Sequence, residues 1–254
     1  LYYMGCAATL HRWVAWQVAS DSVAALLFDV VGASPVSGDA LGRLQRGSID
    51  CLARAISTLV SSSEEPRQIS TALETLTARG ALLSRILSLV DVPSSAVHAL
   101  AILTLATRML HARGGGVLAS QLFACVLPAL LSSSVQGQHV TQALFDLSFH
   151  AQPLTGHLVG VLLPRVQVDA RSHLAGTRVA ALKLLGVLMA SMALLSDDEC
   201  GALAASPPAE SGGDDAHKGA VMQMLHTLSC LAHDPASDVR SLAEHLQRTC
   251  LGTA

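Results

Sequence analysis

The chain of 254 residues is 51% hydrophobic, 14% charged and only 3% aromatic. Its Ala- and Leu-rich composition favours helices over sheets, and the absence of Asn excludes Asn-Gly hairpin turns, so we predict an all-α protein. The net charge of −3 excludes the strongly basic balance that is typical of nucleic-acid-binding proteins, and we expect no nucleic-acid partner.

Apolar residues at helical spacing predict a series of helices along the chain. In order, the predicted helices span residues 3–19, 22–31, 39–61, 67–79, 81–90, 96–112, 117–131, 139–150, 153–166 and 177–195, with a closing pair between 220 and 250. We expect the glycines 114–116 to form a linker between two helices, and Pro128 to kink or shorten the second of them. Residues 167–176 are predicted to be a polar connection.

One segment differs from the rest in composition. Residues 196–218 combine acidic side chains with Pro207, Pro208 and several glycines, which predicts a flexible insertion between helices. The chain begins at Leu1 without Met, so we expect residues 1–254 to be one repeat domain cut from a longer protein. The six cysteines are scattered without a Cys-x-x-Cys pair, which favours an intracellular, reducing location, the cytoplasm or the nucleus.

A helical hairpin near the C-terminus contains a pattern that repeats upstream. Pro235 disfavours helix at the residue before it, Ser237 and Asp238 can cap the helix that follows, and Val239 begins an apolar stripe. The same pattern begins upstream at Ile49, Val97, Val140 and Thr177. A spacing of about 40 residues with two helices per unit is the range of HEAT and armadillo arrays.

The motifs then suggest a family. Asp234-Pro235-x-x-Asp238-Val239-Arg240-x-x-Ala243 resembles the turn and second helix of a HEAT repeat, residues 177–188 are similar to that second helix, and residues 82–110 look like an armadillo unit. The resemblance implies a right-handed α-α superhelix, a solenoid of about five stacked hairpins plus a leading helix, with a concave face for partners.

The resemblance implies a non-enzymatic protein–protein interaction scaffold. Candidate partner contacts are polar positions on the second helices: Asp50, Arg54, His98, Thr141, Arg178, Arg240 and Glu244. Trp13 and Trp16 are a further candidate, as an aromatic anchor for a partner or as an end cap packed on the next hairpin. The alternative function is a structural spacer that packs against another domain of its own parent chain, and an exposed apolar patch would distinguish the two.

Two other binding classes fit the sequence less well. Tubulin-binding HEAT arrays carry Lys and Arg on the turns within each hairpin, whereas the corresponding turns here contain a single Lys or Arg, Arg171. A membrane span needs about 20 apolar residues. The longest apolar run, residues 179–195, is interrupted by Lys183, so we expect no membrane insertion.

The sequence contains no motif that would name a reaction. Neither a Gly-x-Ser-x-Gly elbow nor a Gly-x-x-x-x-Gly-Lys loop occurs, so we predict no enzyme, no cofactor and no small-molecule substrate. His226, Cys230 and His233 share one helical stripe and are zinc-ligand types, which Cys250 or His245 could complete. Cys230 fits the same stripe as a small buried hydrophobe, and we predict no metal.

Overall fold

The computed structural model describes residues 21–32, 39–61, 66–92, 94–132, 138–151, 156–194 and 213–251, together with Ala15. Within these residues the regular secondary structure is helical and includes no strand, which confirms the all-α prediction. The chain divides into two compact units, Leu1–Gln136 and Gly137–Ala254. Whether residues 1–254 form one continuous repeat domain stays a prediction.

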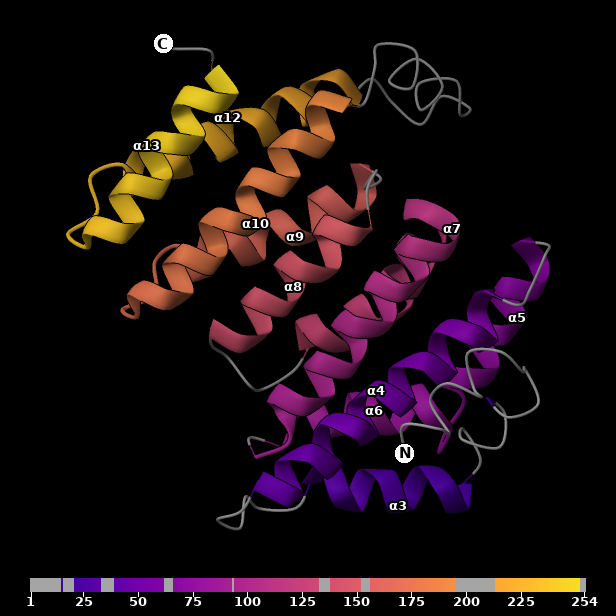
Figure 1. The fold of residues 1–254 in the computed structure, drawn as a ribbon. Helices are drawn as coiled ribbons and strands as arrows, with labels where there is room; N and C mark the ends of the chain where they lie inside the picture. The colour runs from indigo at the N-terminus through magenta and orange to yellow at the C-terminus, as the bar shows by residue number, and fades with distance from the viewer. Residues whose placement is uncertain are drawn as a thin grey trace. The chain divides into compact units, whose positions relative to one another are not determined.

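The first unit is built around two helices that pack along each other. Its described helices are α3 (Asp21–Gly32), α4 (Asp39–Ser61), α5 (Pro66–Thr77), α6 (Leu82–Val90) and α7 (Ala96–Ser132). Helix α4 packs against α7, and α3 and α6 cover α4 and α7 respectively (Figure 1). Gly80, with φ +82°, lies between α5 and α6, where a left-handed residue terminates a helix at little steric cost.

Helix α7 corrects the predicted break at the glycines 114–116 and shows that Pro128 does not shorten the helix. It is continuous over 37 residues, so the glycines 114–116 are helical instead of forming a linker, and Pro128 lies inside the helix. Leu110 and Leu122, on either side of the glycines, are both fully buried. Burying each such side chain contributes about 1.5–3 kcal/mol, which exceeds the cost of about 1 kcal/mol for each helical Gly. Pro128 is exposed, and the helix continues beyond it to Ser132.

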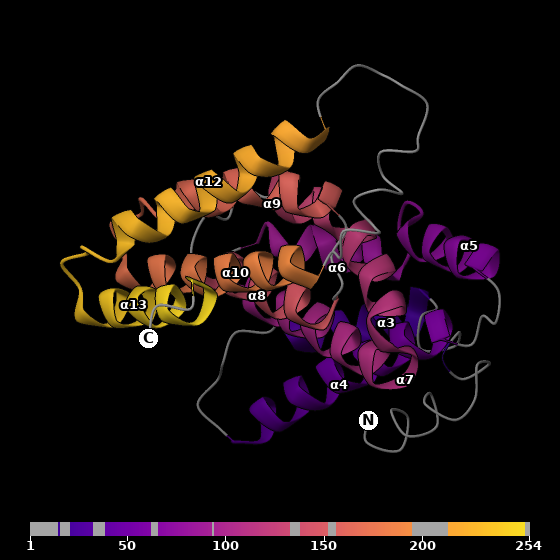
Figure 2. The same cartoon turned by 90° about the horizontal axis from the view of Figure 1, so that it is seen from above.

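The second unit has two layers of helices. Its described helices are α8 (Gln138–His150), α9 (Gly156–Asp169), α10 (Ala175–Leu194), α12 (Gly213–Leu231) and α13 (Ser237–Leu251). Helix α10 packs against both α8 and α13, while α9 packs against α10 and α12. Figure 2 shows α8, α10 and α13 in one layer and α9 with α12 in the other.

Two glycines on α10 allow its neighbours to approach closely. A Cβ on Gly176 would clash with the side chain of Gln138 on α8, and a Cβ on Gly186 would lie 2.9 Å from Cδ2 of Leu246 on α13. Other positions of α10 supply the core, because Leu182, Leu184 and further leucines of this helix are fully buried. Helix α10 is therefore the central element of the second unit.

Two predicted segment boundaries shift in the second unit. Residues 213–218, placed in the insertion by their composition, form the beginning of α12, and the remainder of that insertion lies outside the described residues. Helix α9 includes Pro164 and continues to Asp169, so the connection to α10 is shorter than residues 167–176.

Helix α10 is both long and apolar. Its window Ala175–Met192 is long and apolar enough to cross a membrane, and half of that window is buried inside the protein. The central helix of a helical domain passes the same test because neighbouring helices cover it. Its position between α8 and α13 accounts for its apolar character.

Candidate functional sites

The turn before α13 is held by a buried ion pair. Arg178 on α10 donates from Nε to Asp234 Oδ2 (2.7 Å) and from Nη2 to Asp234 Oδ1 (2.8 Å), and its Nη1 donates to the carbonyl of Ser172 (2.8 Å). Asp234 Oδ1 also accepts from the backbone N–H of Ala236 at 2.9 Å. Arg240 donates to the backbone carbonyl of Asp234, at 2.6 Å. We call Arg178, Asp234 and Arg240 the α10–α13 clasp.

The clasp is an internal structural feature. The side chains of Arg178 and Asp234 are only 11% and 7% exposed. Hydrogen bonds from Arg178 hold the pKa of Asp234 below its ordinary value, and the same bonds raise the pKa of Arg178. Two of the predicted partner contacts, Arg178 and Arg240, therefore use their donors to fix the turn that begins α13.

Thr141 requires a correction among the predicted contacts. It is fully buried on α8, and its hydroxyl donates to Asp169 Oδ2 at 2.7 Å. Arg165 Nε donates to the same oxygen at 2.7 Å. Thr141 presents no surface to a partner in this fold; it connects α8 to the C-terminal end of α9.

The other predicted contacts are dispersed. Asp50 and Arg54 form an ion pair within α4 at 2.7 Å, about a third exposed, and His98 lies half-buried on α7. Glu244 is exposed on α13, where Arg248 donates to its backbone carbonyl. The predicted set is therefore split between the two units. Trp13 and Trp16 lie outside the described residues.

An aromatic surface on α8 and α10 was not among the predicted sites. Phe149 is 56% exposed, and its ring centroid lies 6.1 Å from that of Phe145, one turn earlier on α8. Lys183 of α10 places Nζ 5.8 Å from the centre of the Phe145 ring and 3.5 Å from Gln142 Oε1. Burial raises the pKa of the neighbouring Asp146, against the opposing effects of Gln142 and Lys183. We call Gln142, Phe145, Asp146, Phe149 and Lys183 the α8–α10 face.

The sequence does contain a signal for this face. Phe145 and Phe149 are two of only four phenylalanines in the chain, and they stand four residues apart on one helix. Such a pair indicates one aromatic stripe. The sequence does not show whether a neighbouring helix covers that stripe, which is why the predicted contacts omitted it.

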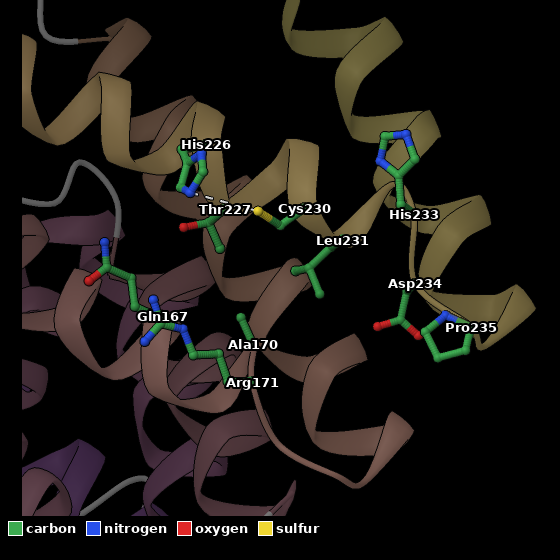
Figure 3. A pocket seen from close by; sticks show the side chains of 10 residues that line it. All are labelled: Gln167, Ala170, Arg171, His226, Thr227, Cys230, Leu231, His233, Asp234 and Pro235. Carbon is green, nitrogen blue, oxygen red and sulfur yellow. Dashed lines mark hydrogen bonds between the residues drawn. The ribbon is translucent and has the colours of Figure 1, made fainter.

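A pocket lies on the other layer of the same unit, where the C-terminal ends of α9 and α12 meet the turn before α13. Its volume is about 300 Å³. The side chains that line it are Gln167, Ala170, Arg171, His226, Thr227, Cys230, Leu231, His233, Asp234 and Pro235 (Figure 3). Gln167 donates to Gln223 Oε1 at 3.2 Å, which joins α9 to α12 at one end of the pocket.

The candidate zinc ligands do not converge in this pocket. His226 Nε2 approaches Cys230 Sγ to 3.8 Å, whereas His233 Nδ1 lies 3.0 Å from the carbonyl of Ser229, at the end of its own helix. Figure 3 shows the His233 ring apart from the other two side chains. Among the residues that the structure describes, no group of three or more His, Cys, Asp or Glu side chains is arranged to hold a metal ion. Cys230 is exposed, so its predicted role as a buried hydrophobe is wrong.

Compared with protein-family models, with curated proteins and with solved structures, the chain gives no match. The resemblance to HEAT and armadillo repeats therefore stays a prediction from the sequence motifs.

Proposed function

We propose that this chain is a non-enzymatic interaction scaffold of HEAT/armadillo-type helical hairpins, and that it binds a partner protein on the α8–α10 face. Stacked hairpins place their second helices side by side in one layer and their first helices in the other. The packing of α8, α10 and α13 in one layer, with α9 and α12 in the other, supports this interpretation for residues 137–254.

The observation that carries the proposal is the exposure of Phe149. An aromatic side chain left in water forgoes about 1.5–3 kcal/mol of burial free energy. Here it stands beside a second Phe and a Lys within a chain that is only 3% aromatic. Aromatic side chains with a neighbouring cation are typical of the residues that dominate protein–protein binding energy.

The predicted location is intracellular, the cytoplasm or the nucleus. Cys51, Cys125 and Cys230 are free thiols among the described residues, which supports a reducing compartment. The spacer alternative uses the same surface: another domain of the parent chain would then cover Phe149. Measuring the accessibility of this face in the parent protein separates the two functions.

The test uses a photo-crosslinking amino acid at position 149 of the full-length parent protein in cells, with position 222 as the control. Met222 is 66% exposed on α12, in the other layer, so it matches Phe149 in exposure but lies away from the face. We expect an adduct with a separate protein from position 149 and not from position 222.

The partner identified in this way is then purified and its affinity measured by calorimetry. We expect Phe149→Ala to weaken binding about tenfold or more and Met222→Ala to change it less than about twofold. An adduct within the parent chain supports the spacer function. Equal effects of the two alanine variants contradict the proposal.

A further inference from the structure

The pocket between α9, α12 and the turn before α13 has a charge pattern that the scaffold proposal does not explain. Asp234 supplies the one carboxylate among its lining residues, and both of its oxygens are engaged by Arg178 at 2.7 and 2.8 Å. Arg171 lines the same pocket and is exposed, and its guanidinium makes no hydrogen bond or ion pair with the part of the chain that the structure describes. The accessible formal charge of the pocket is therefore positive.

We propose that this pocket binds an acidic side chain in a peptide segment of a partner protein, with the guanidinium of Arg171 as its principal donor. Guanidinium groups bind carboxylate and phosphate oxygens through two parallel hydrogen bonds. Such a charged, two-bond interaction is stronger than a single hydrogen bond between neutral groups. The ligand chemistry is an oxyanion on a side chain, which Glu, Asp or a phosphorylated Ser provides equally.

The helix register brings the polar groups of the pocket together. Gln167, in the last turn of α9, and Arg171, just after that helix, are four residues apart. Gln167 donates a hydrogen bond to Gln223 of α12. His226 follows Gln223 by three residues, so it lies near the same surface of α12. Figure 3 shows Gln167, Arg171 and His226 at one end of the pocket, and His233 with Asp234 at the other.

The remaining walls define what accompanies the acidic group. Ala170, Leu231 and Pro235 supply apolar surface. Ligand pockets in proteins start at about 300 Å³, and the volume here, about 300 Å³, suits one acidic side chain with one apolar neighbour. We therefore assign to this pocket a short segment in which Leu stands beside Glu, Asp or phosphoserine.

One effect opposes anion binding at this position. The C-terminal ends of α9 and α12 carry partial negative charge, each equivalent to about half an elementary charge that fades within one turn. The full charge on Arg171 exceeds either of them, and the ligand must meet this side chain instead of the backbone. Neutralising Arg171 should consequently remove most of the preference for acidic ligands.

The experiment measures fluorescence anisotropy with the full chain at low salt and three labelled peptides. The peptides share a neutral Gly/Ser frame around Leu-Glu-Leu, Leu-phosphoserine-Leu or Leu-Gln-Leu. We expect the two acidic peptides to bind about tenfold or more tightly than the Gln peptide, and Arg171→Gln to remove that difference. The ratio between the two acidic peptides identifies which source of the oxyanion the pocket prefers.

Matched variants keep the test specific. Arg248→Gln changes the charge equally on an exposed part of α13, and we expect less than a twofold effect from it. Cys230→Trp fills the pocket from an exposed position and should abolish binding, whereas Ser229→Trp, also exposed but outside the lining, should not. Phe149→Ala should leave peptide binding unchanged, which separates this site from the scaffold proposal.

The result that overturns the inference is equally definite. If the Gln peptide binds as tightly as the acidic ones, or if Arg171→Gln acts no more strongly than Arg248→Gln, the pocket does not recognise an acidic side chain. Thermal unfolding of each variant verifies folding; Arg171 is exposed, so we expect Arg171→Gln to unfold at the temperature of the unsubstituted protein.

Discussion

Replacing Arg178 by Ala tests how the closing hairpin of the second unit is attached. The change removes two charge-assisted hydrogen bonds, of 2.7 and 2.8 Å, from a carboxylate that is only 7% exposed. Leaving one partner of a buried ion pair without the other costs about 3–5 kcal/mol. The backbone N–H of Ala236 still donates a hydrogen bond to Asp234 Oδ1. We therefore expect the free energy of unfolding to fall by about 3 kcal/mol, the lower end of that range.

The assay is urea unfolding of the full chain, combined with amide hydrogen exchange over residues 232–236. Arg178→Ala and Asp234→Ala should each lower the free energy of unfolding. The double variant should lower it by less than the sum of the two single variants, because both single changes remove the same hydrogen bonds. Arg54→Ala is the control, because its pair with Asp50 is about a third exposed, and exposed pairs contribute at most about 1 kcal/mol. Equal losses from Arg178→Ala and Arg54→Ala would refute the structural role of the clasp.

The clasp also has a defined pH dependence. The pKa of Asp234 is lowered in the folded protein, chiefly by its hydrogen bonds from Arg178. Its stabilisation is therefore complete above the ordinary Asp pKa of about 3.9 and is lost as the pH falls through the lowered value. The stability difference between the unsubstituted protein and Asp234→Ala should be constant from about pH 7 to 5 and shrink below about pH 4.

Two further substitutions test buried and half-buried polar groups by the same unfolding assay. Thr141→Val removes the hydroxyl that donates to Asp169 and should destabilise by about 1.5–3 kcal/mol; unchanged stability would mean that this hydrogen bond contributes nothing. Burial raises the pKa of Asp146, so its charged form costs stability above that pKa and the cost disappears as the pH falls. Asp146→Asn should therefore stabilise the protein at neutral pH by at most about 1 kcal/mol after solvent screening, and an advantage that persists at acid pH would contradict this reasoning.

Local patterns predicted most of the helices where the structure describes them. The predicted range 39–61 coincides with α4 (Asp39–Ser61), and the turn at Pro235 begins α13 as expected. These features depend on residues within a few positions of one another: the spacing of apolar side chains, a proline and a capping residue. The repeat anchors were less uniform, because Val140, Thr177 and Val239 are buried whereas Val97 is 46% exposed.

By itself the sequence determined the helical class and the approximate positions of the helices, since periodicity and turn chemistry are local. The tertiary structure decided which polar groups turn inward and which apolar groups stay in water. Arg178 and Thr141 lie on predicted surface positions, yet their partners Asp234 and Asp169 are distant in sequence and close in space. Phe149 is exposed although it continues an aromatic stripe, because burial depends on which helix packs above a residue, and no local pattern contains that information.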